Sequence, residues 1–99
     1  MRLIITISSC ERAVADVAAS KIKDFFIGHN LNVQGPMKIK PGYGPLPSVQ
    51  SGSILDPADI VRLMRRRVRV EGLVDPDLIQ GMQTIGIPST CKLEFASEN

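Results

Sequence analysis

Arginine is the residue type whose spacing in this chain most clearly suggests a chemistry. The segment RLMRRRVRV, residues 62–70, holds five of the seven arginines, although the formal net charge of the chain is only +2. If the segment is a strand, Arg65, Arg67 and Arg69 project from one face at intervals of roughly 6.6 to 7 Å. That interval is comparable with the phosphate spacing along a nucleic-acid strand, and a guanidinium can bind phosphate through two hydrogen bonds. The pattern favours an anionic partner.

The alternative interpretation is a solvated basic face that nearby acidic residues balance. No carboxylate lies inside the five-arginine segment, and the nearest ones follow it at Glu71, Asp75 and Asp77. Internal neutralisation is therefore poor, which again favours an anionic partner. Arg66 falls on the apolar parity of the strand, and near an exposed strand end its charge can still reach water.

Other residue types give little sign of catalysis. His29 stands next to a helix stop, where a capping role is the default, and the glycine spacing of PGYGP does not fit a phosphate loop. Cys10 and Cys91 are far apart in sequence and form no metal-binding motif with the single histidine. We expect no enzymatic activity, no cofactor and no metal.

Size and composition indicate one folded domain that covers residues 1–99. The chain is 43% apolar, with mixed charges. The apolar run Leu3–Ile7 is shorter than the roughly 7 to 15 residues of a signal-peptide core, and no segment approaches transmembrane length. Two unpaired cysteines fit a reducing compartment. We expect a soluble, cytoplasmic protein with no membrane partner.

The first half of the chain predicts a strand, a helix and a second strand. Leu3, Ile5 and Ile7 set a β-branched alternation, and Gly28 and Asn30 can end the helix that starts near Glu11. The buried face of that helix is expected to hold Val14, Val17, Ala18, Ile22, Phe25 and Phe26. The second strand is expected to alternate without interruption through Gly35-Pro36, with an edge position or a bend at the proline, and to face inward at Leu31, Val33, Met37 and Ile39.

The second half begins with a segment of uncertain type. Residues 41–56 hold three prolines and three glycines and predict a long loop. Residues 57–64 fit a helix capped by Asp56 as well as they fit the start of a strand, whereas RVRVEGLV favours a strand.

A second helix and a last strand follow. Asp75 can cap the helix and Pro76 can occupy its first position, with a buried stripe at Leu78, Ile79, Met82 and Ile85. Gly81 is expected on the opposite side of this helix, and Gly86 and Pro88 are expected to end it. The last strand is expected to turn Cys91, Leu93 and Phe95 inward, with a frayed tail, ASEN.

The resulting order, β-α-β, a long connection, then β-α-β, predicts a ferredoxin-like α+β sandwich with two helices on one face of a four-stranded sheet. In that arrangement the end of the first strand lies near the start of the last. Cys10 and Cys91 are then neighbours, most simply as two reduced, buried thiols.

Two stretches resemble the universal small-subunit ribosomal protein S-ten family, which includes the eukaryotic S-twenty proteins. They are LNVQGPMKIKP and MRRRVRVEGLVDPDLIQGMQTIGI, and the N-terminal RLIITISS also fits. The resemblance covers nearly the whole chain. It implies a long strand over residues 60–74 and a hairpin arm over residues 41–59, although the family usually carries several Lys or Arg residues in the arm and this chain has none between residues 41 and 61.

The resemblance implies a structural, non-catalytic protein of the small-subunit head in the cytoplasm. Its partners would be small-subunit rRNA and neighbouring head proteins, with no small-molecule substrate. Tyr43 can stack on a base or pack on its own prolines. The runner-up is a small protein–protein adaptor, of the antitermination type, whose basic strand meets an acidic partner. The candidate RNA-binding residues are Lys38, Lys40, Tyr43, Arg62, Arg65, Arg66, Arg67 and Arg69. Of these, Arg62 and Arg66 are weaker candidates, as are Arg2 and Arg12.

Overall fold

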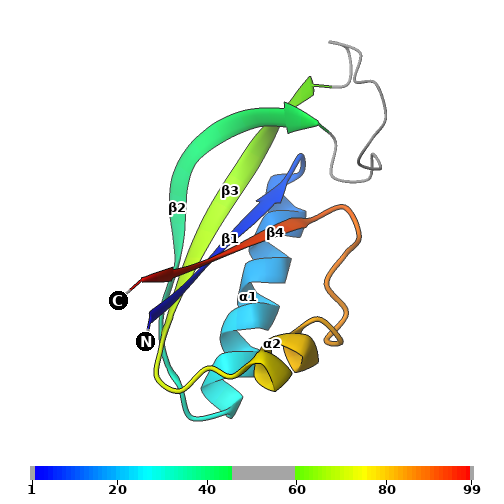
Figure 1. Ribbon diagram of the computed structural model, residues 1–99. Coiled ribbons are helices and arrows are strands. Elements are labelled where there is room, and N and C mark those ends of the chain that lie inside the picture. The colour runs from blue at the N-terminus through cyan, green and yellow to red at the C-terminus, as the bar shows by residue number, and fades with distance from the viewer. Residues whose placement is uncertain (1, 46–59, 99) are drawn as a thin grey trace.

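The computed structural model describes residues 2–45 and 60–98. Its elements follow the order of strands and helices expected from the sequence (Figure 1). They are β1 (Arg2–Ser9), α1 (Arg12–Gly28), β2 (Asn32–Pro45), β3 (Ile60–Glu71), α2 (Pro76–Met82) and β4 (Lys92–Glu98).

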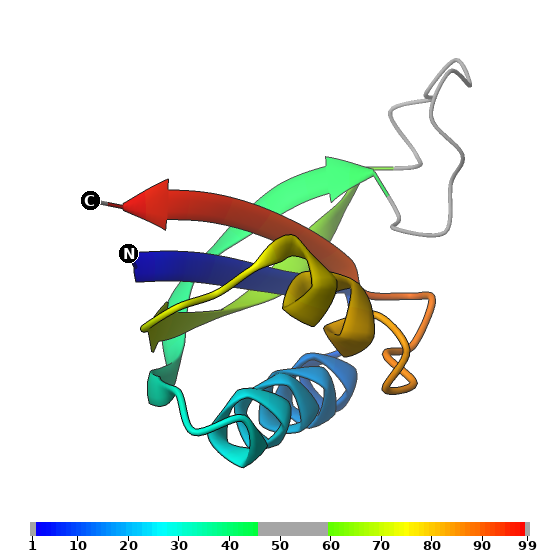
Figure 2. The ribbon, with the colours of Figure 1, turned by 60° about the horizontal axis from the view of Figure 1, so that its bottom comes forward.

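The four strands form one antiparallel sheet in the order β2-β3-β1-β4. Both helices pack on the same side of this sheet (Figure 2). The protein therefore has an α+β architecture, compatible with the sandwich expected from the sequence. None of the helices among the described residues is long and apolar enough to cross a membrane.

The core lies between the sheet and the two helices. Alternate residues of the two central strands, β1 and β3, form the sheet side of the core. Small and aromatic side chains of α1 pack on them. Alternation puts every second strand residue on this side, so the residues between them face away from the helices. The buried core residues are Leu3, Ile5, Ile7, Ala18, Ala19, Ile22, Phe26, Val68, Val70 and Met82.

The capping of α2 is confirmed, but three details of the helices differ from expectation. The Asp75 carboxylate accepts a hydrogen bond from the Leu78 amide at 2.8 Å. The helix ends at Met82, earlier than the predicted stop at Gly86. Gly81 faces α1, because a Cβ there would lie 3.4 Å from the Phe25 ring. In α1, Val17 is half-exposed, and the small Ala15 and Ala19 are buried in the inner face.

The expected uninterrupted alternation of β2 is wrong. Gln34 pairs with Arg69 and Met37 with Arg67, so three steps along β2 match two along β3. The extra residue is a β-bulge at Gly35-Pro36, and it exchanges the two faces of the strand. Val33 points toward the helices, opposite Val70, whereas Met37 and Ile39 lie on the other side.

Gly35 allows the bulge. Its φ is +105°, and a Cβ there would lie 2.8 Å from the Arg67 carbonyl oxygen. A left-handed backbone in close contact with the neighbouring strand excludes any residue with a side chain at this position.

The end of β2 and the C-terminal tail differ from expectation. β2 continues through Pro41 to Pro45, inside the predicted loop. The segment from Ile60 is a strand, which decides between the two alternatives left open by the pattern and agrees with the strand implied by the resemblance. Gly42 to Pro45 pair only with Ile60 to Leu63, so β2 and β3 form a two-stranded ribbon beyond the end of β1. The remainder of the expected arm, 46–59, lies outside the described residues. The expected frayed tail is instead part of β4 and is paired with β1 as far as Glu98.

Candidate nucleic-acid interface

Three arginines form a row on the side of β3 that faces away from the helices. Val68 and Val70 are fully buried against the helices, so Arg65, Arg67 and Arg69 must project to the opposite side. No helix of residues 2–45 and 60–98 covers this open face of the sheet (Figure 2). We call these three residues the arginine row.

The strand neighbours of the arginine row carry no charge. In register, Arg69 lies between Gln34 and Ile4, Arg67 between Met37 and Thr6, and Arg65 between Ile39 and Ser8. The row therefore has no carboxylate directly beside it on β1 or β2. Its three positive charges remain concentrated in the middle of the open face.

The acidic residues described on the open face have basic partners of their own. At one end of the face, the Arg2 guanidinium pairs with the Glu71 carboxylate at 2.6 Å and with Glu98 at 3.1 Å, and this pairing raises the pKa of Arg2. On the edge strand β4, Glu94 is level with Arg67, with Thr6 between them, and its carboxylate lies 3.5 Å from the Lys92 ammonium. Among the described residues, no ion pair includes a member of the arginine row.

The arginines of the row lie partly folded over the sheet. All three are only half-exposed, and the Nε atoms of Arg67 and Arg69 are buried without a hydrogen-bond partner among the described residues. A buried donor without a partner costs roughly 1–3 kcal/mol. Such atoms are the exception in folded proteins, and an acceptor bound at this face would satisfy them.

Arg65 also borders a small polar cavity at the ribbon end of the open face. A Cβ at Gly42 would lie 2.9 Å from Arg65 Nη1, so the guanidinium packs against the glycine backbone. The cavity holds about 210 Å³, and Tyr43 stands beside it with 77% of its surface exposed. Its lining residues are Ser8, Gly42, Tyr43, Gly44, Leu63, Arg65, Lys92 and Glu94.

The structure divides the basic residues that the sequence grouped together. Because of the bulge, Lys38 pairs with Arg66 and so lies on the helix side of the sheet, not beside the arginine row. Lys40 is exposed within a second register shift, between Ile39 and Gly42. Arg62 shares the parity of Arg66 and is exposed.

Arg66 does not reach water, contrary to expectation. It is only 4% exposed, and its Nε donates to the Asp16 carboxylate of α1 at 2.6 Å. Its Nη1 donates to the Arg65 carbonyl at 2.9 Å. Arg66 therefore joins α1 to β3, and this pair neutralises its charge.

Sequence reasoning missed Asp16. The available signal was the wrong parity of Arg66, since a buried guanidinium requires a carboxylate from whatever covers it. Asp16 lies among the small residues Ala15, Ala18 and Ala19 of α1, which allow that helix to approach the sheet.

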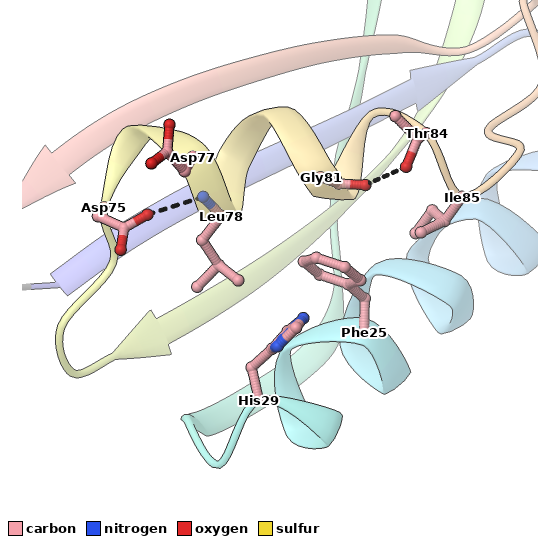
Figure 3. Close-up of a pocket in the computed structure, with 8 residues that line it drawn as sticks. All are labelled: Phe25, His29, Asp75, Asp77, Leu78, Gly81, Thr84 and Ile85. Carbon is pink, nitrogen blue, oxygen red and sulfur yellow. Dashed lines mark hydrogen bonds between the residues drawn. The ribbon is translucent and has the colours of Figure 1, made fainter.

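A further depression lies between the two helices (Figure 3), and no residue of the arginine row is among its lining residues. It is shallow, holds about 480 Å³, and has Phe25, Leu78 and Ile85 on its apolar walls. Its polar groups serve the local structure: Asp75 caps α2, and the Thr84 hydroxyl donates to the Gly81 carbonyl at 2.6 Å. The His29 ring packs edge-on against Phe25 at 4.5 Å, in its expected position at the end of α1.

The cysteines and acidic residues form no metal centre among the described residues. The Cys91 thiol is half-buried and its Sγ lies 3.9 Å from the Val14 carbonyl, and burial raises the pKa of this thiol. Cys10 is exposed. Comparison of the chain with protein-family models and with curated proteins finds no match.

Proposed function

We propose that this chain is an rRNA-binding structural protein of the small ribosomal subunit, similar to the S-ten family, and that its fold is the ferredoxin-like sandwich. The element order and the central position of β1 and β3 support the fold assignment. The sequence stretches quoted above support the family. The partners proposed are rRNA and neighbouring proteins of the subunit head, and no catalysis is proposed.

The arginine row is the single observation that carries the RNA-binding proposal. It places three guanidinium groups along one strand, on an uncovered face and without carboxylates on the adjoining strands. Surface ion pairs would normally reduce such a charge, but the described carboxylates of this face, Glu71, Glu98 and Glu94, are paired with Arg2 and Lys92. A phosphate backbone supplies negative charge at a comparable repeat.

Binding would use two kinds of hydrogen-bond donor of the arginine row. The terminal nitrogens of the guanidinium would donate two hydrogen bonds to a phosphate, and the unpartnered Nε atoms of Arg67 and Arg69 would gain an acceptor. The exposed Tyr43 ring lies on the ribbon, in register with Arg62, and would stack on an unpaired base. The interface would recognise phosphate spacing and single-stranded shape more than sequence.

The test is the salt dependence of RNA binding by two matched variants. Replacing Arg67 and Arg69 with alanine is expected to weaken binding to small-subunit rRNA fragments and to reduce the slope of log K against log salt by about 2. Replacing Lys21 and Lys23 of α1 removes the same charge from the helix layer and should leave the slope close to that of the parent protein. An unchanged slope in both variants would refute the phosphate role of the row.

Two further measurements separate the proposed role from the adaptor alternative. In a gradient at high salt, the protein should sediment with small subunits, whereas free protein at the top would exclude a place in the subunit. The conservative Arg67→Lys, Arg69→Lys variant keeps the charge but loses the planar fork. It should retain the slope and lose part of the affinity. An adaptor would bind an acidic protein and show no such response toward RNA.

A further inference from the structure

A second group of basic side chains surrounds a depression on the helix side of the β2–β3 ribbon. The depression holds about 220 Å³ and lies between the start of α1 and the two strands. Arg12, Lys38 and Arg62 are exposed around it, and the buried Arg66 forms part of its wall. We call this the cationic pocket, and its lining residues are Arg12, Lys38, Ile39, Pro41, Arg62, Met64 and Arg66.

Three local rules bring these side chains together. Arg62, Met64 and Arg66 are alternate residues of β3 and share the helix side. The bulge in β2 turns Lys38 to the same side, opposite Arg66. Arg12 and Asp16 are one helical turn apart on α1, so both face the strand that Asp16 contacts.

The charge of the cationic pocket is strongly positive. The carboxylate that contacts its wall, Asp16, is bound to Arg66 at 2.6 Å. Among the described residues, its lining includes no Asp or Glu. Arg12, Lys38 and Arg62 take part in no ion pair within the described part of the chain, so three cations converge on one concave site.

We propose that the cationic pocket binds a phosphate group, at a site separate from the arginine row. Two arginines and a lysine supply the charge-assisted donors that phosphate requires. Met64 and Pro41 line the same depression and offer apolar contact to a sugar or base attached to the phosphate. Where that phosphate belongs to an RNA strand, the inference rests on the function proposed above.

The two sites lie on opposite faces of β3. Odd-numbered arginines of β3 point to the open face, and Arg62 with Lys38 points to the helix side. A polynucleotide that occupies both sites must pass around the β2 edge of the sheet, or two phosphate-bearing segments must hold that edge between them. The β2–β3 edge would then contact RNA on both faces.

The test compares Arg12→Gln, Arg62→Gln with the matched control Lys21→Gln, Lys23→Gln. Binding of a short single-stranded RNA should weaken in the first variant, and its salt slope should fall by about 2, while the control stays near the parent value. If the first variant behaves like the control while Arg67→Ala, Arg69→Ala still lowers the slope, the cationic pocket is refuted and the RNA-binding function stands.

Amide NMR shifts of the parent protein identify the source of the phosphate. Inorganic phosphate, adenosine monophosphate and the RNA are titrated separately, and the resonances of Arg12, Lys38 and Met64 are followed. Shifts there with all three ligands indicate a site for free phosphate groups, and shifts with the RNA alone indicate a site for the polynucleotide backbone. Shifts confined to Arg67 and Arg69 with every ligand overturn the proposal.

Discussion

The two faces of β3 place the same residue type in opposite circumstances. On the helix side, Arg66 is buried and bonded to Asp16 and to a backbone carbonyl. On the open side, Arg65 and Arg67, its neighbours in sequence, are half-exposed, and no ion pair to them is found among the described residues. Successive side chains along a strand point to opposite faces of the sheet. An arginine that points toward the helices is buried and paired, whereas one that points to the open face keeps its charge available for a ligand.

The difference shows how one strand can serve structure and binding together. The helix side supplies apolar burial and one satisfied ion pair, which hold α1 on the sheet. The open side keeps charge that the fold itself does not neutralise. Substitutions on the helix side should therefore change stability, and those on the open side should change binding.

The largest contrast is expected between neighbouring residues of β1. Ile5 is fully buried opposite Val68, whereas Thr6 lies on the open face opposite Arg67. Ile5→Ala should lower the free energy of unfolding by about 2–5 kcal/mol, because it leaves a cavity in the core. Thr6→Ala should change it by no more than about 0.5 kcal/mol. Urea denaturation measures both, and equal losses would contradict the two-sided description.

Breaking the bulge should have the next largest effect. Gly35→Ala places a Cβ against the Arg67 carbonyl at a left-handed φ and should cost about 1–3 kcal/mol. Gly28→Ala is the control, since a Cβ there meets no atom within 4 Å. The control should be neutral or slightly stabilising. Thermal unfolding followed by circular dichroism compares the two, and a Gly35→Ala protein as stable as the control would contradict the close approach.

Removing the partner of Arg66 should have a comparable cost, and a second substitution should rescue it. Asp16→Ala leaves a buried guanidinium without its carboxylate and should cost about 1–3 kcal/mol. Asp24→Ala, on the same helix but in no ion pair among the described residues, should stay within about 0.5 kcal/mol.

The double variant Asp16→Ala, Arg66→Met removes both charges and should recover most of the loss, because the buried member of the pair, Arg66, no longer leaves a charge without its carboxylate. Chemical denaturation of the set measures the coupling. Additive losses in the double variant would show that Arg66 and Asp16 act independently.

The smallest effect concerns the two thiols, of which Cys91 is half-buried and Cys10 is exposed. Burial raises the pKa of Cys91, so less thiolate is present at a given pH, whereas Cys10 is exposed. Iodoacetamide should label Cys10 first near pH 8, and labelling of Cys91 should require a higher pH. Peptide mass spectrometry follows both sites, and equal rates across this pH range would contradict the burial of Cys91.

Local sequence rules predicted the elements well where the signal is contained in a short segment. The Asp75 cap with Pro76, the helix over residues 12–28 and the order of strands and helices all follow from neighbouring residues. Alternation also placed Arg65, Arg67 and Arg69 together on one face. These features need only the period of a helix or a strand.

The periodicity of a single segment did not predict which residues of α1 and α2 face the neighbouring elements. The sequence favoured Val17 over the smaller Ala15 and Ala19 because hydrophobicity does not report how closely a helix approaches the sheet. It placed Gly81 away from α1, although the missing side chain is what leaves room for Phe25. In both cases the partner element, and not the segment itself, selects the residue.

By itself the sequence determined that one row of arginines would share a face, because alternation is a property of the strand alone. Only the tertiary structure decided that Lys38 would lie on the opposite side, since the extra residue at Gly35-Pro36 exists only relative to β3. It likewise decided that Arg66 would meet Asp16, fifty positions away in the chain. A register is a relation between two strands and an ion pair is a relation between two elements, so neither is present in one segment alone.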